Sequence, residues 1–174
     1  MSIKENSAVF VGMQNNYEKL YKTMGKVFNV KSDSNLLQDL GKVGFLMLDS
    51  QLLYVKAFEN GENVEIINEE KRKLATALGL EDKYVVQSSS EVFDFDTCYK
   101  SMDATWSGMD ELLSDANNSF IYEDLVGIAK GFIDTQSTFV SLECPDETLK
   151  NNFKNELNTR KERIVRTSVS GYSR

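Results

Sequence analysis

Apolar side chains recur every three or four residues along almost the whole chain of 174 residues. In an α-helix this spacing places the side chains on one face, where they can pack against a neighbouring element. The pattern predicts helices over about 7–28, 36–58, 69–78, 91–113, 121–142 and 145–164. The single proline, Pro145, agrees with this prediction, because all-β proteins usually carry more prolines in turns and edge strands. We therefore expect an all-α fold, a bundle of five to six amphipathic helices.

The segment over about 43–67 has a second interpretation, a small β-meander within an α+β fold. The pair Asn60-Gly61 is a good hairpin signal, and residues 64–66 alternate between apolar and polar. Against it, only two residues between 36 and 58 are β-branched, and the segment is rich in Leu, Met, Gln and Lys, which favour helices. We favour the helix, which Gly61 would end in the left-handed conformation.

The length suits one domain, expected over residues 1–166 with a C-terminal tail at 167–174. The connectors are short, so neighbouring helices should be mostly antiparallel. The apolar stripes of the second half predict a core around Trp106, Phe132 and Phe139. No charge-free apolar run of about 18 residues occurs, and no signal-type stretch follows the N-terminus. We expect a cytoplasmic protein without a membrane span.

The absence of histidine excludes several classes of site. It removes the common catalytic triad, mixed Cys/His zinc sites and the usual di-iron bundle, which needs Glu-x-x-His pairs. The two cysteines, Cys98 and Cys144, are too few for a four-thiolate site and are expected to be reduced. Cys144 is predicted at a helix N-terminus, which can lower a thiol pKa, but no activating base is evident. We favour small buried residues at both positions.

Two further motifs bear on chemistry. The run from Gly41 to Gly44 lacks the glycine spacing of a phosphate-binding loop, and two small residues in a closely packed helix explain it better. Glu111 and Asp115 lie four residues apart and share a helical face. Mg²⁺ prefers oxygen ligands and substrate phosphates, so this pair makes a Mg²⁺-dependent nucleotide hydrolase an alternative function. We expect no catalytic residue, no cofactor and no resident metal.

The net charge of −7 is divided unevenly along the chain. Residues 1–80 hold 10 basic and 10 acidic groups and are neutral overall. Residues 81–149 hold 3 basic and 15 acidic groups, a net charge of −12, and residues 150–174 hold 7 basic and 2 acidic groups, a net charge of +5. The acidic segment disfavours direct binding of nucleic acid. It favours docking on a basic protein, because complementary charge steers association.

We therefore predict a non-enzymatic protein-binding module of the inhibitor, immunity or adaptor type. Its acidic contact surface is predicted to consist of eight carboxylates: Asp94, Asp96, Asp103, Asp110, Glu111, Asp115, Glu123 and Asp124. A secondary contact is predicted on the basic C-terminal helix, at Lys150, Lys154, Lys161, Arg163 and Arg166. That helix either packs against the acidic segment of its own chain or binds the acidic face of another copy. The second arrangement makes a self-assembling structural subunit, a homo-oligomer, the other alternative.

Overall fold

The computed structural model describes residues 7–30, 34–59, 61, 63–80, 94–116 and 119–172. In these residues six α-helices occur and no strand. They are α1 (Ala8–Val30), α2 (Ser34–Phe58), α3 (Val64–Ala77), α4 (Phe95–Asp115), α5 (Tyr122–Glu143) and α6 (Glu147–Tyr172). The all-α bundle is confirmed. The apolar sequence Tyr84-Val85-Val86 also predicts a short strand, and these residues lie outside the described ones.

The β-meander alternative over about 43–67 is wrong, because α2 continues unbroken to Phe58. The helix ends as expected at Gly61, which has a φ of 76°. Its amide donates a hydrogen bond back to the carbonyl of Val55 over 2.9 Å. Left-handed glycines of this kind close helices, because they bring the next amide onto a carbonyl of the last turn.

Two helix starts in the middle of the chain differ from the sequence prediction. The helix expected over 69–78, with Asn68 as its cap, is α3 and begins five residues earlier, at Val64. Asn68 is therefore a buried residue inside the helix. α4 begins at Phe95, because Asp94 is extended and its side chain accepts a hydrogen bond from the Thr97 amide over 2.8 Å. The expected start at residue 91 lies outside the described residues.

The end of the chain differs as well. Pro145 was expected at the first position of the last helix, but it precedes the cap. Asp146 accepts a hydrogen bond from the Leu149 amide over 3.0 Å, so α6 begins at Glu147. α6 then continues through Tyr172, so most of the segment 167–174 is helical. The division of the chain at residue 166 stays a prediction.

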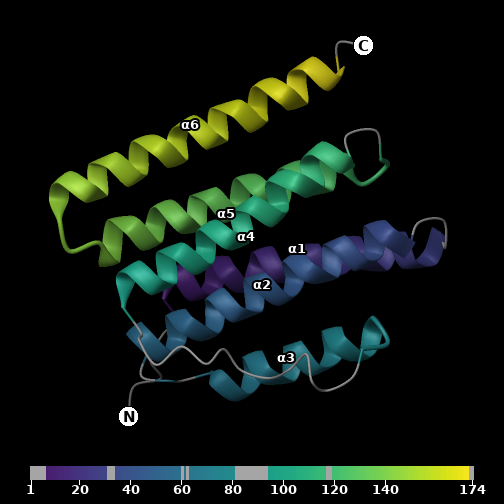
Figure 1. Cartoon of the computed structure of the whole chain (residues 1–174), viewed down its shortest axis with the longest axis horizontal. Coiled ribbons are helices and arrows are strands. Elements are labelled where there is room, and N and C mark those ends of the chain that lie inside the picture. Colours follow the sequence, from purple (N-terminus) through teal and green to yellow (C-terminus); the bar gives the residue numbers. More distant parts are fainter. Residues whose placement is uncertain are drawn as a thin grey trace.

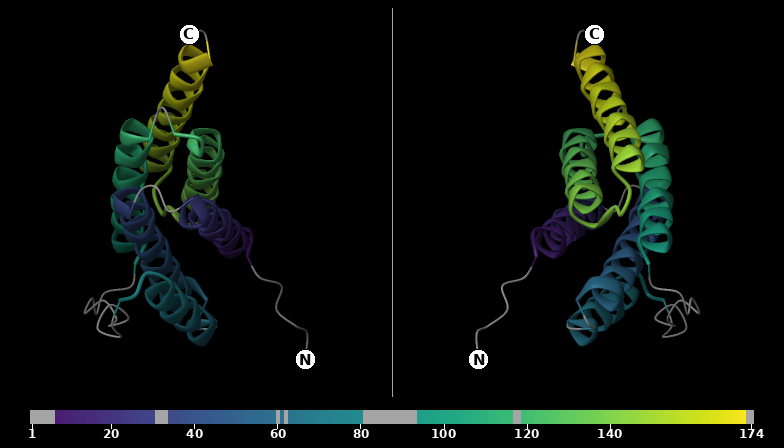
Figure 2. Two further views of the ribbon diagram at one scale, coloured as in Figure 1. Left: turned by 90° about the vertical axis from the view of Figure 1, so that its right-hand side faces the viewer. Right: turned by 90° about the vertical axis from the view of Figure 1, so that its left-hand side faces the viewer.

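Four helices, α1, α2, α4 and α5, form a closed ring of contacts in which each packs on two others. α3 packs on α2 and α6 packs on α5, and the two outer helices lie at opposite ends of the molecule (Figures 1 and 2). Helices that follow one another within each half run antiparallel, as expected from the short connectors (Figure 1). None of the described helices is both long and apolar enough to cross a membrane.

The two halves of the chain follow one plan. In each, the first two helices pack together and the third packs on the second, and the halves join through α1 with α5 and through α2 with α4. This set of contacts is unchanged when α1 is exchanged with α4, α2 with α5 and α3 with α6. The exchange also turns the α2–α4 contact into the α1–α5 contact, and these two contacts lie on opposite sides of the ring.

The core agrees with the predicted stripes. Trp106, Phe132 and Phe139 are buried, and Phe139 stacks on Phe95 with their ring centroids 5.0 Å apart. The glycines of α2 allow α3 to approach closely. A Cβ on Gly44 would lie 3.0 Å from Leu74, and one on Gly41 would overlap a leucine side chain at the end of α3. The helix-packing interpretation of these glycines is therefore confirmed.

Candidate functional site

The eight predicted carboxylates do not form one continuous surface. Asp94 is used as the N-cap of α4, and hydrogen bonds from Thr97 lower the pKa of its carboxyl. Asp96 lies in the first turn of the same helix and forms an exposed ion pair with Lys100 over 3.7 Å. These two charges therefore have local roles, and a direct contact of either with a partner stays a prediction.

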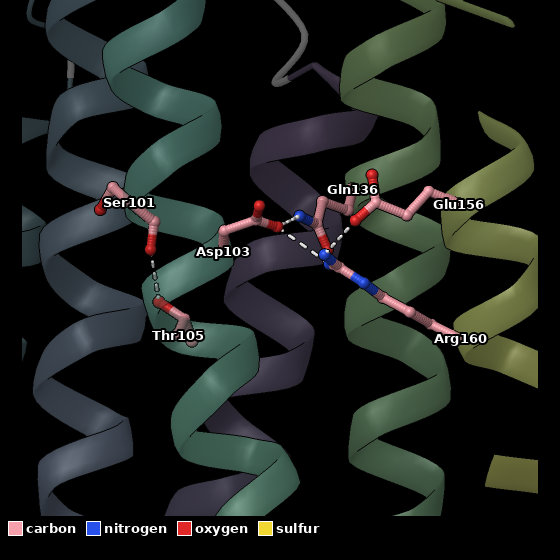
Figure 3. Close-up of polar contacts among 6 residues, drawn as sticks. All are labelled: Ser101, Asp103, Thr105, Gln136, Glu156 and Arg160. Atoms are coloured by element: carbon pink, nitrogen blue, oxygen red, sulfur yellow. Dashed lines mark hydrogen bonds and ion pairs between the residues drawn. The ribbon is translucent and has the colours of Figure 1, made fainter. Parts of the chain in front are cut away.

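Asp103 lies at the centre of a hydrogen-bonded network between α4, α5 and α6 (Figure 3). One of its oxygens accepts hydrogen bonds from the Gln136 amide and the Arg160 guanidinium, both over 2.9 Å. Arg160 also donates to Glu156 over 2.8 Å and lies over the Trp106 ring. Burial lowers the pKa of the Arg160 guanidinium, but the hydrogen bond and charge of Asp103 outweigh it and the pKa rises. Asp103 thus compensates a cation of its own chain.

The basic C-terminal helix makes the same kind of contact at two more positions. Lys161 pairs with Asp134 of α5 over 2.6 Å, and Arg163 pairs with Asp110 of α4 over 3.1 Å. The interpretation that this helix packs against the acidic segment of its own chain is confirmed.

The other predicted basic contacts lie elsewhere on the same helix. Lys150 pairs within α6 with Glu147 over 3.1 Å, and Lys154 is partly buried. The side chain of Arg166 lies outside the part of the structure that is described. A contact of these three residues with another molecule stays a prediction.

Glu123 and Asp124 face α1 across the α1–α5 groove. We call this the lysine groove, because α1 contributes three lysines to it. It has a volume of about 300 Å³ and is lined by Lys19, Lys22, Thr23, Lys26, Glu123, Asp124, Gly127 and Ile128. Asp124 pairs with Lys26 over 2.7 Å. The two predicted acids therefore lie among cations, which weakens their contribution to an acidic surface.

Glu111 and Asp115 line the counterpart groove between α2 and α4, together with a third carboxylate, Asp39. We call it the acidic groove. It has a volume of about 320 Å³ and is lined by Asp39, Lys42, Val43, Leu46, Gly108, Glu111, Leu112 and Asp115. A Cβ on Gly108 would lie 3.1 Å from Val43, so this glycine allows the two helices to approach closely.

The charge of the acidic groove is not compensated within the described residues. Three carboxylates face one lysine, Lys42, and no ion pair of Asp39, Glu111 or Asp115 with another described residue is formed. The floor is apolar, formed by valine and leucine side chains. A groove of this kind suits a lysine or arginine side chain, whose stem packs on apolar atoms while its charged end meets a carboxylate.

Glu111 and Asp115 are also the pair on which the magnesium alternative rests. Across the part of the chain that the structure describes, no three acidic or thiol side chains are placed to hold a metal ion. Magnesium chemistry needs several oxygen ligands that converge on one point. The spacing of Glu111 and Asp115 places both on one groove, and the Mg²⁺-dependent nucleotide hydrolase stays a prediction.

Both cysteines are buried free thiols, as favoured from the sequence. Burial, assisted by the nearby carboxylates of Asp94 and Glu143, raises the pKa of the Cys98 thiol to about 12. Cys144 ends α5 and does not begin α6, so the expected position at a helix N-terminus is wrong. Its Sγ lies 3.5 Å from the carbonyl of Asp146. Neither thiol has the exposed, electropositive surroundings of a reactive cysteine.

The candidate site is thus a groove with three uncompensated carboxylates and an apolar floor, and its chemistry is the recognition of cationic side chains. Sequence reasoning identified Glu111 and Asp115 but missed Asp39, which lies more than seventy residues earlier. The sequence offered one indication of Asp39, because this acidic residue directly precedes Leu40 of the apolar stripe of α2. Comparison of the chain with protein-family models, curated proteins and solved structures finds no match in any of the three.

Proposed function

We propose that the chain is a non-enzymatic protein-binding module, of the inhibitor, immunity or adaptor type, whose acidic groove receives a basic partner protein. The observation that carries the proposal is the set of three carboxylates, Asp39, Glu111 and Asp115, around an apolar floor. Their charges face one lysine and have no ion-pair partner among the described residues. Such a surface attracts a basic partner and orients it during encounter.

The apolar floor supports a partner that presents lysine or arginine side chains on a folded surface. The aliphatic stem of such a side chain would pack against the partly exposed Leu46, above the buried Val43 and Leu112, and its charged end would reach the carboxylates. Arginine would have the further advantage of a planar group that meets a carboxylate through two hydrogen bonds. Nucleic acid is disfavoured by the same negative charge.

Three of the other predicted carboxylates are less available to a partner, because they already form ion pairs within the chain. Asp103 and Asp110 are paired with α6, and Asp124 is paired with Lys26. Their charges contribute to the field around the groove but are less available for direct pairing. We place this activity in the cytoplasm, in keeping with two free buried thiols.

The proposal is tested by affinity capture from the native host with three forms of the full-length chain. The first is the wild type, and the second carries Asp39→Asn, Glu111→Gln and Asp115→Asn in the groove. The third is a matched control with Glu18→Gln, Glu65→Gln and Glu69→Gln, which removes three exposed acidic charges from α1 and α3. Retained proteins are quantified by mass spectrometry at 50 and 300 mM NaCl.

We expect the wild type and the control to retain the same basic protein at low salt. The groove variant should lose it, and high salt should weaken it strongly for all forms, because exposed charges are screened. A partner retained equally by the groove variant, or retained equally at both salt concentrations, would refute the proposed function.

A further inference from the structure

The acidic groove and the lysine groove correspond at seven of their eight lining positions. On α4 the acidic groove is lined at Gly108, Glu111, Leu112 and Asp115, and on α1 the lysine groove is lined at Lys19, Lys22, Thr23 and Lys26. Both sets follow the spacing i, i+3, i+4 and i+7. The partner helices agree as well, because residues 39, 42 and 43 of α2 have the spacing of residues 124, 127 and 128 of α5.

At two of the corresponding positions the two grooves carry opposite charge. Where the acidic groove has Glu111 and Asp115, the lysine groove has Lys22 and Lys26. Lys26 pairs with Asp124 over 2.7 Å, whereas the counterparts of these two residues are both carboxylates, Asp115 and Asp39. The acidic groove thus has a carboxylate at the position where its counterpart has Lys26, and its one lysine, Lys42, lies on the other wall.

Two of the three lysines in the lysine groove are not used in an ion pair with another described residue. Lys19 and Lys22 are exposed, and no ion pair between either of them and another described residue is formed. They lie three residues apart, about 4.5 Å along the helix axis, which is close to the rise of about 6 Å between Glu111 and Asp115. The cations of α6 differ, because Arg160, Lys161 and Arg163 are already paired with α4 and α5.

We propose that the chain associates with a second copy of itself, with Lys19 and Lys22 of one copy docked in the acidic groove of the next. The charge complementarity of the two surfaces identifies this occupant. The proposal moves self-association from the basic C-terminal helix, where the sequence placed it, to α1. It shares the acidic groove with the proposed function but does not depend on it.

The geometry also determines the kind of assembly. The two grooves lie on opposite sides of the four-helix ring, so one copy can use both at once. Because the two surfaces lie on opposite sides, two copies cannot make both contacts with each other in a twofold dimer. The contact therefore extends into a chain or a ring of copies. We therefore expect a concentration-dependent series of species that does not stop at the dimer.

The test is sedimentation velocity of the purified full-length chain at low and high salt. One variant, the ridge variant, carries Lys19→Gln and Lys22→Gln, and another, the groove-pair variant, carries Glu111→Gln and Asp115→Asn. The control for the ridge variant carries Arg72→Gln and Lys73→Gln on α3, which removes the same charge from an exposed surface. Circular dichroism checks that each variant keeps its helical content.

We expect the wild type and the control to associate at 20 mM NaCl and to dissociate at 300 mM NaCl. Each of the two variants alone should stay monomeric, because each lacks one surface. Their equimolar mixture should form dimers and nothing larger, since only one pair of complementary surfaces remains. A wild type that is monomeric at about 1 mM and low salt, a ridge variant that associates like the wild type, or a mixture that stays monomeric would each overturn the proposal.

The proposed function is separated from this inference by the ridge variant. It retains the acidic groove and should still capture the basic partner from the host while failing to associate with itself. A wild type that associates with itself but captures no basic partner would refute the proposed function alone. A wild type that captures the partner but stays monomeric would refute the second-copy contact alone.

Discussion

Lys71 of α3 is buried and forms an ion pair with Asp49 of α2, which water reaches. The ammonium lies 2.6 Å from the Asp49 carboxylate, and the side chains are 1% and 38% exposed. We expect Asp49→Ala to cost far more stability than Lys71→Met, although both remove the same contact. The first change leaves a buried ammonium without its partner, whereas the second leaves a carboxylate that water already reaches. Methionine also keeps most of the apolar volume of the lysine stem.

The magnitudes follow from the burial of each end. Removing one partner of a fully buried pair costs about 3–5 kcal/mol. Because the Asp49 end of the pair is solvated, we expect the lower end of this range, about 3 kcal/mol, for Asp49→Ala. For Lys71→Met we expect about 0–1 kcal/mol, since apolar replacements of buried charges are often neutral or stabilising. In a chain of this size the larger loss lowers Tm by about 6–12 °C.

Urea denaturation followed by circular dichroism at pH 7 measures both free energies of unfolding. The double variant should be close to Lys71→Met alone, because it contains no buried ammonium. If Lys71→Met loses as much stability as Asp49→Ala, burial of the charge does not determine the cost and the reasoning is wrong.

Three further outcomes are expected from buried polar groups. The Tyr17 hydroxyl is buried and has no hydrogen-bond partner among the described residues, so Tyr17→Phe should be neutral or stabilising by up to about 1 kcal/mol in urea denaturation; a loss above that value would contradict it. Burial and the carboxylate of Glu59 raise the pKa of Glu143. The folded state therefore binds the proton more tightly than the unfolded state, so Glu143→Gln should raise Tm at pH 7 and have little effect below about pH 4; an equal gain at both pH values would argue against this origin. In a Cys144→Ser background, Cys98 is buried with a pKa of about 12 and should react with a thiol reagent at pH 8 only at the rate of unfolding; labelling within seconds would show that the thiol is accessible.

The helices could be predicted because their signal is local. The stripe that begins with Phe10 and Met13 determines the buried face of α1 without reference to any other helix. The start of α3 was misplaced because Asn68 has the composition of a cap, whereas Asn63 precedes the helix in a left-handed conformation with a φ of 70°. Local composition could not distinguish these two starts, because both place an asparagine before a run of acidic and apolar residues.

The candidate site was only partly predictable because it depends on contacts between distant segments. Glu111 and Asp115 share a helical face by their spacing alone, but Asp39 joins them only through the packing of α2 on α4. The uneven charge of the chain was visible in the sequence. Packing of the basic last helix on the acidic segment was one of two expected arrangements. The individual pairs could not be predicted, since Asp103 and Arg160 are 57 residues apart and meet only when α6 folds back.

Exchanging the two halves of the chain leaves the helix contacts unchanged. This has a consequence for how the side chains of the two grooves can vary. A symmetric dimer of three-helix subunits would have the same contacts, but both of its grooves would necessarily carry identical side chains. In a single chain each groove is encoded separately, so one can become acidic while the other keeps its lysines. Joining the halves thus converts a twofold-symmetric scaffold into a polar molecule, with unlike surfaces on opposite sides.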